Sequence, residues 1–125
     1  MQSKKNRIII VDDDEDLLKI LMSAFGAKGY EVKTFVNGKD GLNYLSEEKN
    51  MAHVALVILD RMLPDMDGLE ILKSIKTQSA PVLILSVLSS EKDVLIGLRK
   101  GAVDYLGKPF SLPILMQKAS VLIKE

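Results

Sequence analysis

Short apolar runs alternate with amphipathic stretches along the whole chain, and this alternation constrains the fold more than any other feature. A short uninterrupted aliphatic run predicts a strand buried on both faces, whereas apolar residues recurring every three or four positions predict a helix. The predicted strands span residues 8–11, 30–36, 54–59, 81–85 and 103–106, and the predicted helices span 14–27, 37–48, 68–78, 90–100 and 111–124. Strand-then-helix units in succession predict a doubly wound α/β fold, in which helices cover both faces of a parallel sheet.

The size and charge of the chain exclude several classes of protein. Its 125 residues fit a single domain over 1–125, with a polar N-terminal extension over 1–6. The 17 basic and 17 acidic side chains cancel, which argues against direct nucleic-acid binding and against anionic membranes. The chain has no cysteine, which excludes disulfides and suits a reducing compartment. No apolar run approaches the ~20 residues of a membrane span, so we expect a cytoplasmic protein.

Polar side chains follow the predicted strands, at the edge of the sheet where open α/β proteins bind their ligands. Asp12 and Asp13 follow the first strand, and Asp60 follows the third. Ser86 follows the fourth strand, and Lys108 follows the fifth. Because the carboxyl ends of parallel strands meet at one edge, we expect carboxylates, a hydroxyl and an ammonium to gather there.

The clustered carboxylates point to a metal ion. Two unit charges about 4 Å apart repel by about 4 kcal/mol at an effective dielectric constant of ~20, and a divalent cation removes that repulsion. An all-oxygen set of ligands favours Mg²⁺ over zinc. The alternative is that the acids only begin a helix, where they interact favourably with the helix dipole. That alternative accounts for residues 14–16 but not for Asp60, which lies in a different unit.

Four short motifs occur in order along the chain, each at the end of a predicted strand. They are Val11-Asp12-Asp13-Asp14, the run from Leu59 to Gly68, Leu85-Ser86, and the run from Gly101 to Phe110. Together they resemble the receiver domain of two-component response regulators, over residues 7–123. The resemblance implies a flavodoxin-like fold with five parallel strands in the order 2-1-3-4-5, and a signalling function activated by phosphorylation.

The resemblance also implies how phosphorylation would occur. Asp60 would accept a phosphoryl group from a phosphohistidine on a histidine kinase or phosphotransfer protein, forming an acyl phosphate. The implied ligands of Mg²⁺ are Asp12, Asp13, Asp60 and the main-chain carbonyl of Met62. Such a domain catalyses its own phosphorylation and its own dephosphorylation, without being a metabolic enzyme.

Four further residues have roles that the same resemblance implies. Lys108 would contact the phosphoryl oxygens, and a cis Lys108–Pro109 peptide bond would aim the lysine inward. Ser86 would donate a hydrogen bond to the phosphoryl group and move toward it. Tyr105 would be an aromatic switch whose ring fills the space that Ser86 leaves. The alternative for Tyr105 is a plain core residue, because aromatic side chains favour strands.

Two features depart from the family pattern. Val87 stands where the family usually has a smaller residue, so we expect it to restrict access of small donors and of hydrolytic water to the phosphoryl site. The helices over 90–100 and 111–124 carry more apolar residues than one buried stripe requires. In the family these helices and the strand between them bind a second copy or an output partner, and simple hydrophobic scatter is the alternative.

A docking module that has the receiver fold but acts without phosphorylation is the alternative function. Val87 and the apolar last helix favour this alternative. The intact residues of the implied phosphorylation site count against it, namely Asp12, Asp13, Asp60, Ser86 and Lys108. A phosphatase with an aspartate nucleophile usually needs a second acid two residues on, where this chain has Met62. Asp65 and Asp67 lie in a turn and are expected to make turn hydrogen bonds only.

Overall fold

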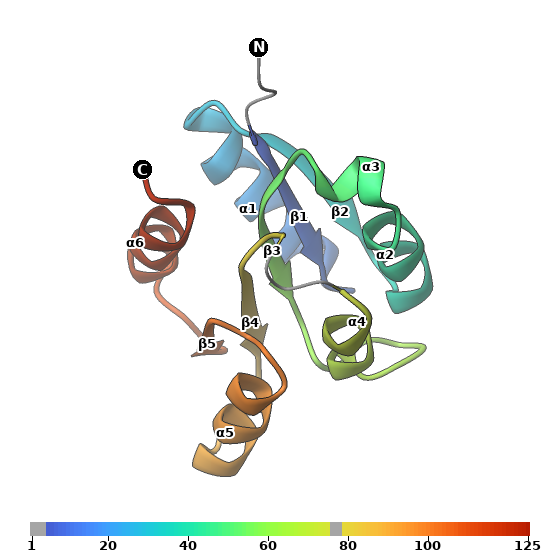
Figure 1. Ribbon diagram of the computed structural model, residues 1–125. Helices are drawn as coiled ribbons and strands as arrows, with labels where there is room; N and C mark the ends of the chain where they lie inside the picture. Colours follow the sequence, from blue (N-terminus) through green and yellow to red (C-terminus); the bar gives the residue numbers. More distant parts are fainter. Residues whose placement is uncertain (1–4, 76–78) are drawn as a thin grey trace.

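Five parallel strands form one sheet in the computed structural model, which describes residues 5–75 and 79–125 (Figure 1). The strands are β1 (Arg7–Val11), β2 (Glu31–Phe35), β3 (Val54–Leu59), β4 (Val82–Ser86) and β5 (Asp104–Gly107). Their order in the sheet is β2-β1-β3-β4-β5, and every neighbouring pair is parallel. The predicted flavodoxin-like, doubly wound sheet is therefore confirmed.

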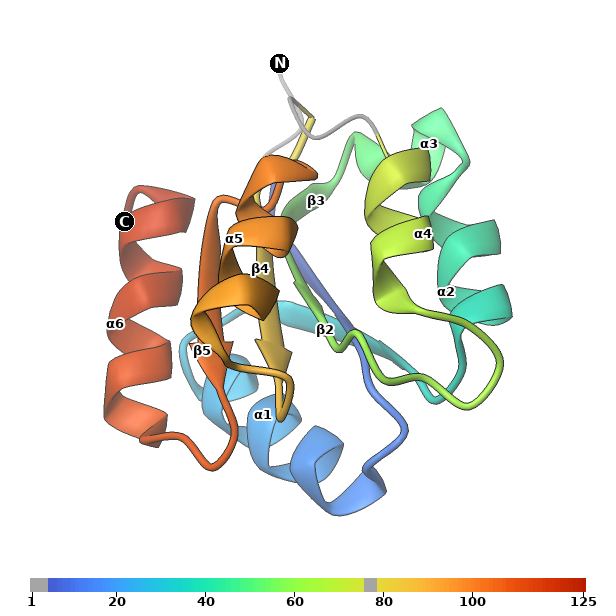
Figure 2. The same ribbon diagram turned by 90° about the horizontal axis from the view of Figure 1, so that it is seen from below.

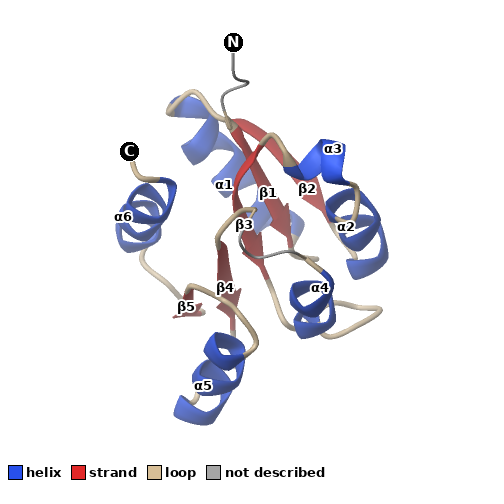
Figure 3. Ribbon diagram, in the orientation of Figure 1, coloured by secondary structure: helices blue, strands red, loops and turns tan. Residues whose placement is uncertain are grey.

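Helices lie on both faces of this sheet. They are α1 (Glu15–Ala27), α2 (Gly38–Leu45), α3 (Glu48–Met51), α4 (Gly68–Ser74), α5 (Glu91–Arg99) and α6 (Leu112–Ile123). Figure 2 shows α2 and α4 on the opposite side of the sheet from α1 and α6, and Figure 3 marks the helices in blue around the red strands. Among the described residues, we find no helix with both the length and the apolar character that crossing a membrane requires.

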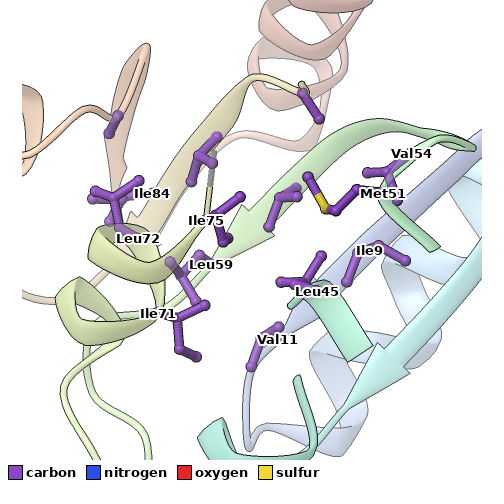
Figure 4. Packing of buried hydrophobic residues seen from close by; sticks show 14 of the residues in the cluster. Ile9, Val11, Leu45, Met51, Val54, Leu59, Ile71, Leu72, Ile75 and Ile84 are labelled. Carbon is purple, nitrogen blue, oxygen red and sulfur yellow. The ribbon is translucent and has the colours of Figure 1, made fainter. Parts of the chain in front are cut away.

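Alternate side chains of β1 enter two separate cores. Ile8 and Ile10 pack with α1 and α6, whereas Ile9 and Val11 pack with the helices of the other face. Figure 4 shows this second core, in which Ile9 and Val11 lie beside Leu45 of α2. The alternation follows from the two-residue period of a strand. Because both faces are covered, β3 is apolar at every position, and β1 and β4 are apolar except for Arg7 at the start of β1 and Ser86 at the end of β4.

Polar side chains cap the N-termini of the helices and thereby determine where the loops at the carboxyl edge of the sheet end. Asp14 accepts a hydrogen bond from the main-chain N–H of Leu17 at 3.1 Å and so begins α1. Asn37, Ser90 and Ser111 accept equivalent bonds at the starts of α2, α5 and α6. Each such cap typically stabilises a helix by ~1 kcal/mol. The acids that follow β1 therefore divide between helix initiation and the acidic cluster described below.

Three of the predicted helices agree with the structure to within one residue at each end, and two differ by more. The helix predicted over 37–48 is two helices, because α2 ends at Leu45 and α3 begins at Glu48. The helix predicted over 68–78 ends at Ser74, because Ile75 has extended dihedral angles and is buried in the core. Residues 76–78 of that prediction lie outside the described residues. So do residues 1–4 of the predicted polar extension over 1–6.

Candidate functional site

The carboxyl ends of the strands bring Asp12, Asp13, Asp60 and Lys108 together. Asp12 directly follows β1 and Asp60 directly follows β3. The main-chain N–H of Asp60 donates a hydrogen bond to the carbonyl of Val11 at 3.0 Å, which aligns the two strand ends. Each of the three acids offers one carboxylate oxygen, and these oxygens lie within 4.8 Å of one another. The sheet topology thus assembles the acidic cluster from residues almost 50 positions apart.

Lys108 lies between two buried carboxylates. Its Nζ is 2.7 Å from Oδ2 of Asp12 and 3.0 Å from Oδ2 of Asp60, and these two acids are 2% and 5% exposed. Burial raises the pKa of Asp12, although Lys108 and the main-chain N–H of Asp14 oppose the rise. Burial alone would lower the pKa of Lys108, but its hydrogen bonds to the two acids raise it above its usual value. The Lys108–Pro109 peptide bond is cis.

The backbone holds the carboxylate of Asp60 in place. Its Oδ1 accepts a hydrogen bond from the main-chain N–H of Met62 at 2.9 Å. The loop then folds back, so that the N–H of Gly68 donates to the carbonyl of Arg61 at 2.8 Å. A Cβ at Gly68 would lie 2.1 Å from the carbonyl oxygen of Asp60, so glycine is required for this close approach. The backbone of Met62 consequently lies beside the carboxylate of Asp60.

The acidic cluster fits Mg²⁺. Three carboxylates supply only oxygen ligands, and one ammonium balances only part of their negative charge. Asp13 is exposed, whereas Asp12 and Asp60 are buried, so the cluster opens to solvent on one side. An open side suits Mg²⁺ because this ion keeps several of its water ligands when it binds to a protein.

Ser86 and Tyr105 both contact the main chain of Leu88. Ser86 is fully buried, and its Oγ accepts a hydrogen bond from the N–H of Leu88 at 3.3 Å. The hydroxyl of Tyr105 donates to the carbonyl of Leu88, and the ring packs against Gly97 of α5. Val87, between Ser86 and Leu88, is 57% exposed. The side chain of Val87 therefore projects toward solvent next to Ser86 and is not buried in the core.

Asp65 and Asp67 lie in the loop after β3 but make structural hydrogen bonds. Asp65 accepts hydrogen bonds from the main-chain N–H groups of Gly38 and Lys39, at 2.7 and 2.9 Å. These bonds hold the pKa of Asp65 below its usual value. Asp67 accepts a hydrogen bond from the N–H of Leu69 at 2.9 Å and so begins α4. Both acids therefore position the loop without joining the acidic cluster.

Gly68, Leu88 and Arg61 take part in this arrangement, although none of them is predicted from the sequence as a site residue. Gly68 follows the Asp-rich turn, and a turn glycine is a signal that could have identified it. Leu88 acts through its main-chain atoms, so its side chain carries no signal. Arg61 is 9% exposed, although an arginine in an acidic loop normally indicates a solvated side chain.

Known proteins resemble this chain in sequence and in structure. The family model described as the response regulator receiver domain matches residues 8–120. A probable transcriptional regulatory protein of Picosynechococcus sp. is 39% identical over 128 residues, which cover 98% of this chain and 51% of that protein. The transcriptional regulatory protein GltR of Pseudomonas aeruginosa is 35% identical over 129 residues, which cover 100% of this chain and 52% of that protein. The chain spans about half the length of these curated relatives.

A solved structure shares the arrangement of the sheet and helices. The BeF3-activated receiver domain of DrrB superposes with a TM-score of 0.82 at 38% sequence identity. The match covers 95% of this chain and 97% of the DrrB domain.

Proposed function

Because this chain belongs to the response regulator receiver domain family, we propose that Asp60 accepts a phosphoryl group from a phosphohistidine on a histidine kinase or phosphotransfer protein. The observation that carries the proposal is the position of Lys108, whose Nζ contacts both Asp12 and Asp60 at the edge of the acidic cluster. A cation fixed beside a buried carboxylate is suited to the negative charge of an incoming phosphoryl group. The state of Asp60 then controls a partner or an output domain.

Asp60 acts as the nucleophile. One of its carboxylate oxygens forms a P–O bond while the P–N bond to the histidine breaks, and the ring leaves as neutral imidazole because it takes up a proton from water. Lys108 and the hydroxyl of Ser86 stabilise the phosphoryl oxygens, because phosphoryl transfer depends mainly on positioning and charge neutralisation. Mg²⁺ bound by Asp12, Asp13, Asp60 and the carbonyl of Met62 would neutralise charge on the carboxylates and on the phosphoryl group. Attack of water on the acyl phosphate returns the carboxylate of Asp60, so the domain also dephosphorylates itself.

Ser86 and Tyr105 transmit the effect of phosphorylation from Asp60 to other parts of the domain. Movement of Ser86 toward a phosphoryl group would remove its Oγ from the N–H of Leu88. Because the carbonyl of Leu88 accepts the hydrogen bond of the Tyr105 hydroxyl, the same movement changes what holds the ring of Tyr105. The two arrangements differ in population rather than in fold, and phosphorylation shifts that balance.

The face formed by α5, β5 and α6 is the proposed contact surface for a second copy of the chain or for an output partner. Large apolar side chains on these elements and on the turn before β5 are at least 40% exposed, namely Leu95, Leu98, Val103, Ile114 and Val121. Large exposed apolar patches mark interaction surfaces in soluble proteins, so these exposed side chains favour a contact surface on this face.

Control of transcription is the proposed output. The two relatives are named transcriptional regulatory proteins, and each is about twice as long as this chain.

We propose that residues 1–125 form one receiver domain that acts in the cytoplasm. With 17 basic and 17 acidic side chains, the domain itself is not proposed to contact nucleic acid.

Removal of Mg²⁺ tests the proposed phosphorylation. We expect a chelator to abolish the transfer of phosphoryl groups from a small phosphodonor to the chain. Asp13→Asn should raise the Mg²⁺ concentration needed for half-maximal phosphorylation by at least about tenfold, the scale seen when a group that supports a metal site is lost. Intact-mass spectrometry across a Mg²⁺ titration measures both effects.

Asp16→Asn is the matched control for Asp13→Asn. Asp16 is an exposed acid in the first turn of α1 and lies outside the three-acid cluster. The control removes the same charge from the same end of the sheet, so its Mg²⁺ requirement should equal that of the wild type. A shared shift in both variants, or phosphorylation that persists in chelator, would contradict the proposed metal site.

Replacing Val87 with alanine should shorten the lifetime of the acyl phosphate. Val87 projects next to Ser86 at the surface, so a smaller side chain should admit hydrolytic water more easily. We expect dephosphorylation to accelerate roughly threefold, equivalent to ~0.6 kcal/mol in the barrier. Val103→Ala removes the same atoms from another valine that is 53% exposed, and it should leave the rate unchanged. An unchanged or slower rate in Val87→Ala would contradict the proposed role.

A further inference from the structure

Arg61, the residue after Asp60, is a buried cation that the proposed chemistry does not use. Its Nη2 lies 3.3 Å from Oδ2 of Asp67, and its Nη1 lies 3.7 Å from Oδ1 of Asp93. Neither Nε nor Nη1 has a hydrogen-bond acceptor among the described residues. Buried guanidinium groups are normally paired and fully hydrogen-bonded. The contacts of Arg61 are therefore incomplete, and a small shift of its neighbours would change them.

Both carboxylates that face Arg61 also take part in the start of a helix. Asp67 begins α4 through Oδ1, which accepts a hydrogen bond from the N–H of Leu69 at 2.9 Å. Asp93 belongs to the capping box of α5, where its Oδ2 accepts a hydrogen bond from the N–H of Ser90 at 3.3 Å. In each case the second carboxylate oxygen faces Arg61. The guanidinium thus links the end of β3 to the first turns of two helices.

The charge of Arg61 also acts on Tyr105. Burial raises the pKa of Tyr105, Arg61 opposes that rise, and the negative charge of Asp93 adds to it. The ring of Tyr105 packs closely on α5, where a Cβ at Gly97 would lie 2.8 Å from its Cδ2 atom. The contact with Asp93 therefore links Arg61 to α5, and the ring of Tyr105 in β5 packs on the same helix.

We propose that Arg61 is a positioning residue that couples the loop after Asp60 to α5 and Tyr105 through its contact with Asp93. The inference rests on the proposed function, because the loop is expected to respond to a phosphoryl group on Asp60. One peptide bond separates Asp60 from Arg61, so a shift of this loop moves the guanidinium. A change in the 3.7 Å separation from Asp93 then alters the position of α5 and the surroundings of the Tyr105 ring.

Fluorine NMR of the chain labelled with 3-fluorotyrosine tests this coupling. The chain has three tyrosines, and Tyr105→Phe identifies the resonance of Tyr105. The probe is beryllium fluoride with Mg²⁺, which imitates a phosphoryl group on Asp60. The readout is the displacement of the Tyr105 resonance at saturating probe, together with the probe concentration that gives half-saturation.

Two variants remove the contact from opposite sides. Arg61→Met removes the charge while keeping a long side chain, and Asp93→Asn removes the partner charge while keeping an oxygen that can accept the hydrogen bond of Ser90. We expect half-saturation within about threefold of wild type in both, so occupancy of the Asp60 site is preserved. The displacement of the Tyr105 resonance should fall below about half of its wild-type size in each variant, with little further loss in the double variant.

Two further variants separate coupling from general damage. Arg61→Lys keeps the charge without the planar fork and should recover part of the displacement. Arg99→Met removes an exposed arginine from the end of α5 and should give the full displacement.

A wild-type displacement in both Arg61→Met and Asp93→Asn would overturn the inference. If Arg61→Met fails to fold, Asp93→Asn decides alone, because it keeps Arg61 and the cap of α5. A wild-type chain that does not bind the probe would instead contradict the proposed function, and the inference would fall with it.

Discussion

Replacing Lys108 with methionine is expected to slow phosphorylation of Asp60 by about a hundredfold or more, the effect of removing one preorganised donor from a charged transition state. Nζ of Lys108 is the cation that contacts both Asp12 and Asp60 in the described part of the chain. Without it, an incoming phosphoryl group has Mg²⁺ beside the two buried carboxylates but lacks the side-chain cation that contacts both of them. The rate of mass gain with a small phosphodonor at saturating Mg²⁺ measures the loss.

The same substitution is expected to lower the free energy of unfolding in the presence of chelator. Breaking a fully buried ion pair by removing one partner costs roughly 3–5 kcal/mol. The side chain of Lys108 keeps 16% exposure, so we expect a smaller cost of ~2 kcal/mol. Urea unfolding with and without Mg²⁺ measures this cost, and Mg²⁺ should restore part of it by neutralising the unpaired acids.

Lys118→Met is the matched control for Lys108→Met. Lys118 makes an ion pair of similar length, 2.9 Å to Asp104, but both side chains are about one-third exposed. Exposed pairs contribute at most about 1 kcal/mol, so this variant should stay close to wild type in stability and in phosphorylation rate. Equal phosphorylation of wild type and Lys108→Met would contradict the role assigned to Lys108.

Much of the sheet could be predicted because its signal is local. The uninterrupted apolar run of β3 predicts the observed bounds Val54–Leu59. A strand covered on both faces is apolar throughout, so the polar residues on either side mark its ends. The order of the strands follows from the resemblance to the receiver family and from the doubly wound topology. The edge strand β2 spans Glu31–Phe35 and is narrower than the predicted 30–36, because a strand that is only partly buried has no continuous apolar run to mark its ends.

The ends of two helices could not be predicted, because tertiary packing decides them. No glycine or proline marks the break between α2 and α3, so residues 37–48 read as one helix. Ile75 fits a helical repeat, but it is buried only after leaving the helix and entering the core between α4 and the sheet. In both cases a helical pattern in the sequence continues past the point where the core requires a different direction.

The acidic cluster could be anticipated from topology, whereas the surroundings of Arg61 could not. Asp12 and Asp60 follow strands that the fold places side by side, so their proximity is a consequence of the strand order. Arg61 is buried because Asp67 and Asp93 arrive from two different helix starts. No local sequence pattern predicts that these two acids lie beside Arg61, and a charged residue in a turn normally indicates an exposed side chain.

Replacing Asp60 with asparagine tests whether Asp60 is the residue that accepts the phosphoryl group. Asparagine keeps the shape of the side chain but has no carboxylate oxygen to form an acyl phosphate. The measurement is intact mass after incubation with a phosphorylated histidine phosphotransfer domain or a small phosphodonor in Mg²⁺, with peptide mapping of the modified residue.

We expect wild type to gain one phosphoryl group located on Asp60, and we expect Asp60→Asn to gain none. An equal gain in Asp60→Asn would place the acceptor elsewhere and contradict the role proposed for Asp60. A wild-type chain that gains nothing from either donor, and a Val87→Ala chain that also gains nothing, would favour a docking module that acts without phosphorylation.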